Sequence, residues 1–130
     1  MAMNQDVLKK MKFTGETALI VNAPEGMVPA GWSTDLANHA QQSVPFAILF
    51  VKNEAQFREQ FGTVCPSLVD DAMFWVCYPK KTNGIPTDVN RDVLWRVAHE
   101  ISEHTAVPNV AVDDQWSALR FRHQSKVKRG

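Results

Sequence analysis

Three short apolar runs limit the folds that this sequence can adopt more than any other feature. The first is centred on residues 18–21 (ALIV) within a predicted strand over residues 16–23, the second covers residues 45–51 (PFAILFV) and the third residues 72–78 (AMFWVCY). A strand that is continuously apolar is typical of a sheet covered on both faces. Segments of helical length separate the runs, which predicts parallel strands joined by right-handed crossovers.

Around these strands the sequence predicts helices. A short one covers residues 6–11, and Ser33 or Thr34 caps a second over residues 35–42. Asn53 caps a third, in which Phe57 and Phe61 lie one turn apart on the same face.

The last third of the chain predicts one more helix and two closing strands. Thr87 or Asp88 caps the helix, which runs to about residue 103, because valines and an isoleucine recur every four residues along it. The strands cover residues 107–112 and 117–122, and their short link predicts an antiparallel hairpin. One strand of that hairpin either inserts between its neighbours or lies at an edge of the sheet.

The expected fold is therefore a single α/β domain over residues 1–130, with residues 1–5 and 125–130 as frayed ends. We expect three Rossmann-like layers, with helices on both faces of a mostly parallel sheet of about five strands and a C-terminal antiparallel β-hairpin.

The charge balance and the cysteines exclude several functional classes. Fourteen basic and fourteen acidic residues give no net charge, whereas a general nucleic-acid or membrane-surface binder needs a basic field. Cys65 and Cys77 are too few for a disulfide scaffold, and the longest apolar run falls far short of the roughly 20 residues that span a bilayer. The polar start of the chain has no signal-peptide core. These features predict a cytoplasmic protein with reduced thiols.

Several catalytic motifs are missing from the sequence. Residues 22–26 hold one glycine where a dinucleotide fingerprint needs three, and residues 31–35 lack the second glycine of a nucleophile elbow. His99 and His104 are five residues apart, a spacing that turns them about 140° from each other on a helix. Cys65 has no adjacent Lys or Arg to stabilise a thiolate. No cofactor, metal or catalytic set is predicted.

Ligands of open parallel sheets bind outside the carboxyl ends of the strands, which here selects the loops at residues 22–26, 52–53 and 78–84. The third loop is the most basic, and the helix after it offers N–H groups and a positive dipole end. We therefore predict a small anionic ligand. The candidate residues are Asn22, Glu25, Gly26, Tyr78, Lys80, Lys81, Thr82, Asp88 and Arg91. The alternative is a solvated loop in which Asp88 only caps the helix.

Three more residues have two interpretations each. Alternation places Trp116 and Arg120 on one face of the last strand, either as a cation–π pair or ligand clamp, or as part of a covered strand along which the arginine stem lies. Trp32, in a loop, is either a partner contact or a staple over the core.

Four segments carry a family resemblance: residues 22–26 (NAPEG), 46–52 (FAILFVK), 74–81 (FWVCYPKK) and 112–121 (VDDQWSALRF). Over about residues 6–122 the chain resembles a small bacterial family of domains of unknown function, which implies a fold but no catalytic residues. The order of elements is also similar to the second half of a class I methyltransferase fold. The acidic, glycine-rich loop that would hold S-adenosylmethionine is missing here, so this similarity supports a Rossmann-like sheet and weakens the case for a methyltransferase.

The sequence thus favours a non-enzymatic module that binds a small ligand or another protein, because the basic loop lacks an assembled acid, base, nucleophile or metal set. The alternative is an enzyme or degenerate methyltransferase-like domain that uses Lys80, Lys81, Arg91 and Glu25 on a small anionic or nucleotide-like ligand. A third interpretation is a homodimer formed through a strand edge or Trp32. Ligand binding requires Lys80 and Arg91 to converge.

Overall fold

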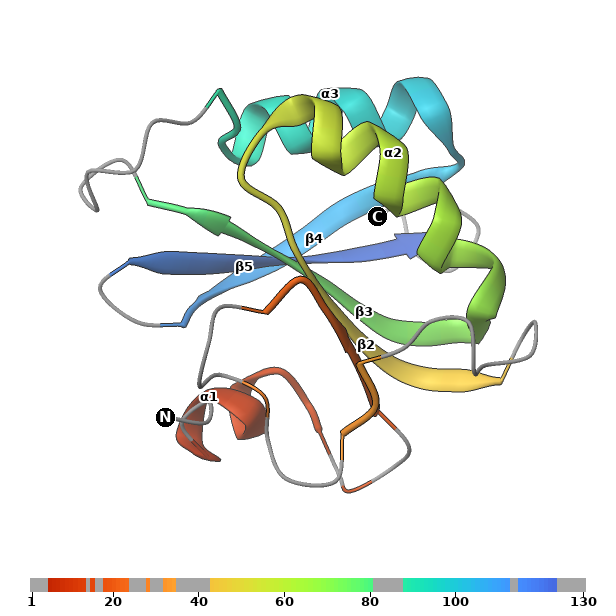
Figure 1. Cartoon of the computed structure of the whole chain (residues 1–130), viewed down its shortest axis with the longest axis vertical. Helices are drawn as coiled ribbons and strands as arrows, with labels where there is room; N and C mark the ends of the chain where they lie inside the picture. The colour runs from red at the N-terminus through yellow and green to blue at the C-terminus, as the bar shows by residue number, and fades with distance from the viewer. Residues whose placement is uncertain are drawn as a thin grey trace, which may run out of the picture.

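The computed structural model describes residues 5–13, 15, 18–23, 28, 32–34, 43–80, 88–112 and 115–123. Within these ranges five strands form one sheet in the order β1-β2-β3-β5-β4 (Figure 1). The elements are α1 (Gln5–Lys10), β1 (Ala18–Val21), β2 (Val44–Phe50), α2 (Glu54–Val64), the short 3₁₀ turn η2 (Cys65–Ser67), β3 (Leu68–Pro79), α3 (Arg91–Ile101), β4 (His104–Ala111) and β5 (Trp116–His123). The predicted helix at residues 35–42 and both predicted frayed ends, apart from residue 5, lie outside the described residues.

The sheet is mixed, so the prediction of a mostly parallel, Rossmann-like sheet is wrong. β1, β2 and β3 pair in parallel, whereas β5 is antiparallel to both of its neighbours, β3 and β4. The antiparallel pairings extend over more residues than the parallel ones. The cause is the short link after β4, which turns the chain straight back, so that β5 fills the place between β3 and β4 in the opposite direction.

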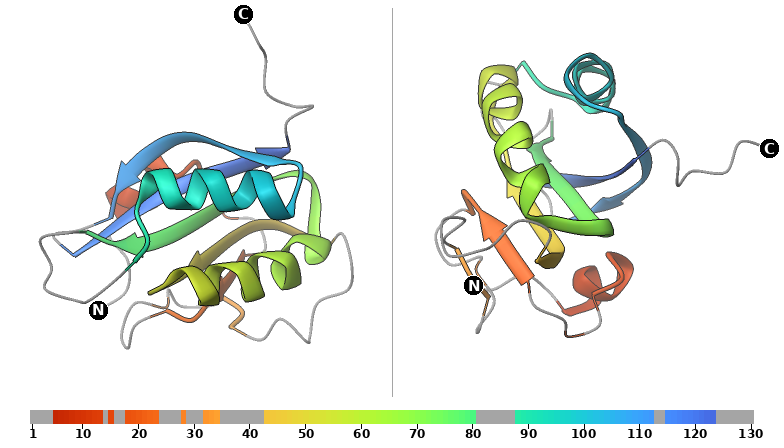
Figure 2. Two further views of the ribbon diagram at one scale, coloured as in Figure 1. Left: turned by 90° about the horizontal axis from the view of Figure 1, so that it is seen from above. Right: turned by 90° about the vertical axis from the view of Figure 1, so that its right-hand side faces the viewer.

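The two faces of the sheet form separate cores, because successive side chains of a strand point to opposite sides. β3 presents Phe74, Val76 and Tyr78 to the core beneath α2 and α3. It presents Trp75 and Cys77 to the core that α1 covers. Figure 2 shows α2 and α3 side by side on one face of the sheet and α1 on the opposite face.

The core beneath α2 is built on aromatic rings. Phe57, Phe61 and Val64 recur at helical spacing and are buried, and the two phenylalanines share one face of the helix as the sequence predicts. The Phe61 ring lies 5.3 Å from Phe74 of β3 and 5.3 Å from Phe121 of β5, measured between ring centroids. Phe61 therefore joins the helix to two neighbouring strands.

The opposite core is closed by α1 and by Trp32. Met11 is fully buried, and its carbonyl oxygen accepts a hydrogen bond of 3.0 Å from Nε1 of Trp75. Trp32 packs against Phe13 and Phe46, with ring centroids 4.9 and 5.5 Å away. These contacts match the interpretation of Trp32 as a staple over the core.

None of the helices in the described residues is long and apolar enough to cross a membrane.

The N-termini of α2 and α3 are capped by asparagines. Asn53 accepts a hydrogen bond of 2.8 Å from Gln56 N, which confirms the predicted cap of α2. Asn90, not Thr87 or Asp88, caps α3 through Val93 N at 2.9 Å. The predicted start of that helix is therefore two to three residues early.

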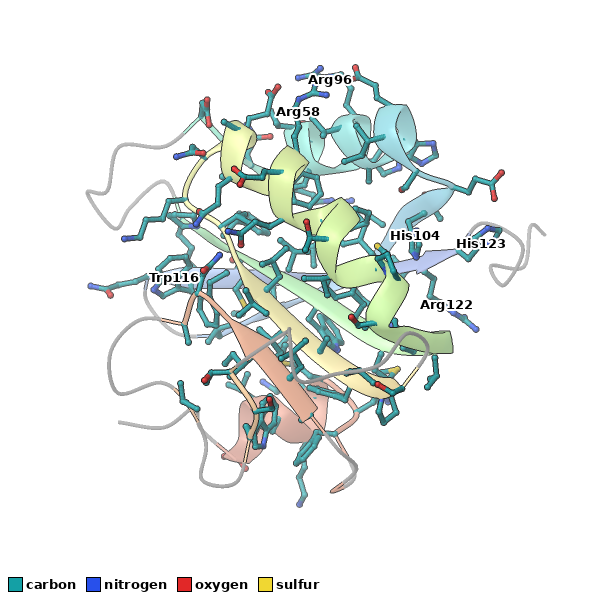
Figure 3. All side chains as sticks on the ribbon, turned by 45° about the vertical axis from the view of Figure 1, so that its right-hand side comes forward. Arg58, Arg96, His104, Trp116, Arg122 and His123 are labelled. Carbon is teal, nitrogen blue, oxygen red and sulfur yellow. The ribbon has the colours of Figure 1, made fainter. Side chains whose placement is uncertain are left out.

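Four charged residues join the outer faces of α2 and α3. Arg58 contacts Glu54 at 2.9 Å and Glu100 at 2.8 Å, and Arg96 contacts the same two carboxylates at 3.7 and 3.3 Å. Figure 3 shows Arg58 and Arg96 together at this surface. The hydrogen bond from Arg58 holds the pKa of Glu100 below its usual value. The network aligns two helices that both carry their apolar faces to the sheet.

Candidate functional site

The carboxyl ends of the three parallel strands lie together, and Asn22 marks the end of β1. Its backbone has a φ of 61°, in the left-handed region that Asn tolerates better than most residues. Its Nδ2 donates to the carbonyl of Phe50 at 3.5 Å, at the end of β2, and to Oε1 of Gln60 on α2. Asn22 thus ties β1 to β2 and to the helix that follows β2.

Tyr78 lies at the carboxyl end of β3, directly opposite Ser117 of β5. The side chain is only 7% exposed, and its hydroxyl is hydrogen-bonded to the Ser117 side chain. Burial raises the pKa of Tyr78, while the positive charge of Arg91 and the bond with Ser117 lower it in part. The hydroxyl therefore stays protonated at neutral pH and acts as a donor or acceptor of hydrogen bonds.

Arg91 and Lys80 flank Tyr78. Arg91 is the first residue of α3, is exposed, and acts on the Tyr78 hydroxyl through its charge. Lys80 follows β3 and is half-buried, with its backbone N–H donating to the carbonyl of Gln115 at 2.8 Å. Two predicted residues of the segment between them, Lys81 and Thr82, lie outside the described residues, as do Glu25 and Gly26. The structure brings Tyr78, Lys80 and Arg91 to one end of β3.

Asp88 does not cap the helix that follows it. Its Oδ1 accepts a hydrogen bond of 2.7 Å from the backbone N–H of Glu54, the first residue of α2. The carboxylate therefore occupies a position at the N-terminus of α2 that an anionic ligand would otherwise favour. Together with Asn53 and Asn90, it reduces the number of N–H groups that these helices offer to a ligand.

Trp116 and Arg120 do not join Tyr78. Trp116 is 3% exposed and packs edge-on against Phe50, with 5.1 Å between ring centroids, in the core on the α1 side. Arg120 lies four residues further along β5, so alternation places it on the same face as Trp116. It lies opposite Trp75 and is half-buried. Tyr78 belongs to the core on the other face. The sheet itself thus separates the predicted residues into two groups, a division that depends on strand register and not on local sequence.

A hollow of about 180 Å³ opens beside the Asn22–Gln60 contact, a feature that sequence reasoning missed. The residues that line it come from the end of β1 and from α2: Val21, Glu59, Gln60, Thr63 and Val64. Ligand pockets usually measure about 300–1,000 Å³, so this hollow is small for a metabolite.

The cysteines and histidines form no catalytic or metal site that the described residues reveal. No group of three or more His, Cys, Asp or Glu among them is placed to hold a metal. Burial raises the pKa of the Cys65 thiol to about 12, so it stays protonated, and Cys77 is fully buried. α3 ends at Ile101 and His104 begins β4, so the two histidines lie on different elements.

Comparisons of the chain with protein-family models, with curated proteins and with solved structures found no match. The function must therefore be argued from the site itself.

Proposed function

We propose that this chain is a non-enzymatic module that binds a small anionic ligand at the carboxyl end of β3. The observation that carries the proposal is the effect of the Arg91 charge on the buried Tyr78 hydroxyl, which Ser117 also contacts. Lys80 adds a second positive charge at the same end of the strand. A guanidinium, an ammonium and hydroxyl groups form strong hydrogen bonds with carboxylate or phosphate oxygens.

Binding is favoured over catalysis because neither the Asp88 carboxylate nor the Tyr78 hydroxyl is available as a general base. A general base must reach the proton that it removes, but the Asp88 carboxylate already accepts the Glu54 N–H. The raised pKa of Tyr78 keeps its hydroxyl neutral, which suits a hydrogen-bond donor better than a base. Cys65 and Cys77 form no disulfide, which supports the further proposal that the module works in the cytoplasm.

A thermal-shift measurement tests the proposal with phosphate, nucleotides, S-adenosylmethionine and small carboxylic acids as probes. A ligand that binds only the folded chain adds about 2.7 kcal/mol at one hundred times its Kd, which raises Tm. We expect Arg91→Gln to remove most of that rise. Lys9→Gln, which removes an exposed positive charge from α1 on the other face, serves as the matched control.

A chain whose Tm none of these probes raises would contradict ligand binding. The competing function is then an interaction module, for which Trp95 is the specific observation: it is 48% exposed on α3. Exposed tryptophans are enriched at protein interfaces. Sedimentation at two concentrations separates the outcomes, because self-association through this helix raises the sedimentation coefficient with concentration, whereas a monomer throughout excludes it.

A further inference from the structure

Three histidines gather where α3 ends and the β4–β5 hairpin begins. His104 is the first residue of β4 and lies directly opposite His123, the last residue of β5, with 5.9 Å between ring centroids. His99, in the last turn of α3, forms a hydrogen bond of 2.9 Å with the Thr105 hydroxyl. Figure 3 shows His104 and His123 together at one end of the sheet, far from Trp116 at the other end.

The His104 ring lies in a setting that suits only its neutral form. It packs edge-on against Phe61 at 5.5 Å, and its Nδ1 is buried without a hydrogen-bond partner. A proton on this ring would create a buried positive charge with no acceptor, facing a second imidazole. Burial first, and then the charge of His123, lower the pKa of His104, while Glu103 acts in the opposite direction.

The remaining groups around His104 offset such a charge only in part. Glu103 already accepts a hydrogen bond from Nε2 of His123 at 2.8 Å. α2 contributes the Phe61 ring. The Cys65 thiol of η2 packs against the same core, and burial keeps it neutral by raising its pKa to about 12. Arg122 alternates to the other face of β5, and Figure 3 shows its side chain directed away from His104. A positive charge on His104 is therefore opposed by burial and by His123, and only Glu103 among the groups named here favours it.

The backbone at His104 is fastened to the last turn of α3. The His104 N–H donates to Oγ of Ser102 at 3.1 Å, and that hydroxyl donates to the carbonyl of Ala98 at 2.7 Å. The Ser102 N–H also bonds to the Ala98 carbonyl, at 3.0 Å. A displacement of the His104 ring would therefore pull on the bonds that end the helix.

We propose that the cluster of His99, His104 and His123 is a pH-sensitive joint, in which protonation in mild acid drives His104 away from Phe61 and detaches the last turn of α3 from β4. The joint lies six residues along β5 from Ser117, a span of about 20 Å in an extended strand. It therefore stands independently of the ligand proposed beside Tyr78.

Hydrogen exchange at pH 7.5 and pH 5.5, corrected for intrinsic rates, tests the joint in the full chain. We expect protection of the amides at residues 98–107 to fall by up to about tenfold, because pH 5.5 lies one unit below the ordinary pKa of histidine, while strand β2, away from the joint, keeps its protection. Unchanged protection at residues 98–107, or an equal loss in β2, would overturn the proposal.

Two variants and one titration identify His104 as the responsible group. His104→Phe retains a ring against Phe61 but cannot titrate, so its protection should not depend on pH in this range. His123→Gln removes the opposing charge and should raise the pKa of His104. NMR titration of the wild-type imidazoles needs no variant to fold: a His104 signal that titrates at or above about pH 6.5, the ordinary value, would exclude the joint.

Discussion

The Asp88 carboxylate stabilises a helix that begins 34 residues before it in the sequence. Its bond to the Glu54 N–H satisfies one of the four N–H groups that have no partner within α2. From the sequence, Asp88 is correctly identified as a capping residue but assigned to the wrong helix. Capping preferences are local, and α3 uses Asn90, whereas the contact with Glu54 exists only once the sheet brings both loops together.

Asp88→Ala should therefore destabilise the chain although Asp88 is exposed. We expect the free energy of unfolding to fall by about 1 kcal/mol, because α2 loses an N-terminal acceptor. Asp88→Asn retains an acceptor oxygen and should lose clearly less. Urea denaturation followed by circular dichroism measures both variants. An equal loss in the two would show that the charge of Asp88, and not its hydrogen bond, stabilises the protein.

At the scale of elements, the strands and the closing antiparallel hairpin were predictable, but the place of the hairpin in the sheet was not. Continuous apolar runs place β1, β2 and β3 correctly, since burial on both faces leaves no polar alternation. The same pattern says nothing about which neighbour a strand pairs with. The crossover through α3 carries β4 past one position in the sheet, and β5 then fills it in the antiparallel direction. The connections between the elements determine this position of β5, and the hydrophobic periodicity of the sequence carries no information about it.

Phe61 is the side chain through which α2 holds the sheet. Its ring contacts Phe57, Phe74, Phe121 and His104, and it is fully buried. We expect Phe61→Ala to cost about 3–5 kcal/mol, because it removes apolar contact and leaves a cavity that two elements share.

Urea denaturation measures this loss, with the exposed neighbour Glu59→Ala as a control expected to change stability by less than about 0.5 kcal/mol. A loss below about 1 kcal/mol for Phe61→Ala would mean that the core collapses around the gap and that α2 does not depend on this ring.

At the scale of the whole molecule, the sheet both assembles and divides the candidate site. The sequence correctly predicts that the parallel strands end at one edge, where Asn22, Tyr78 and Arg91 lie. It does not reveal that Tyr78 and Trp116 belong to opposite faces. Alternation assigns faces within one strand, but the relation between two strands depends on their register, which only the folded sheet defines.

The same division makes the two cysteines reporters of the two cores. Cys65 packs against the core beneath α2, and Cys77 is buried in the core on the α1 side. Because every strand contributes side chains to both faces, we expect the cores to unfold in one cooperative transition. Cys77→Ala leaves only Cys65, and Cys65→Ala leaves only Cys77, so each variant reports on one core. In each variant, the remaining thiol should become reactive toward a disulfide reagent at the urea concentration at which circular dichroism shows that variant to be half unfolded.

In the native state Cys65 should react at pH 8 about a thousandfold more slowly than a free thiol. Burial raises its pKa from 9.0 to about 12, and only the thiolate attacks a disulfide. Because this native reaction is slow, the reaction of Cys65 on unfolding can be distinguished from its reaction in the folded protein, even though its side chain is partly exposed. If Cys65 became reactive well before Cys77, the α2 face would open by itself. The sheet would then join two layers of different stability instead of one cooperative domain.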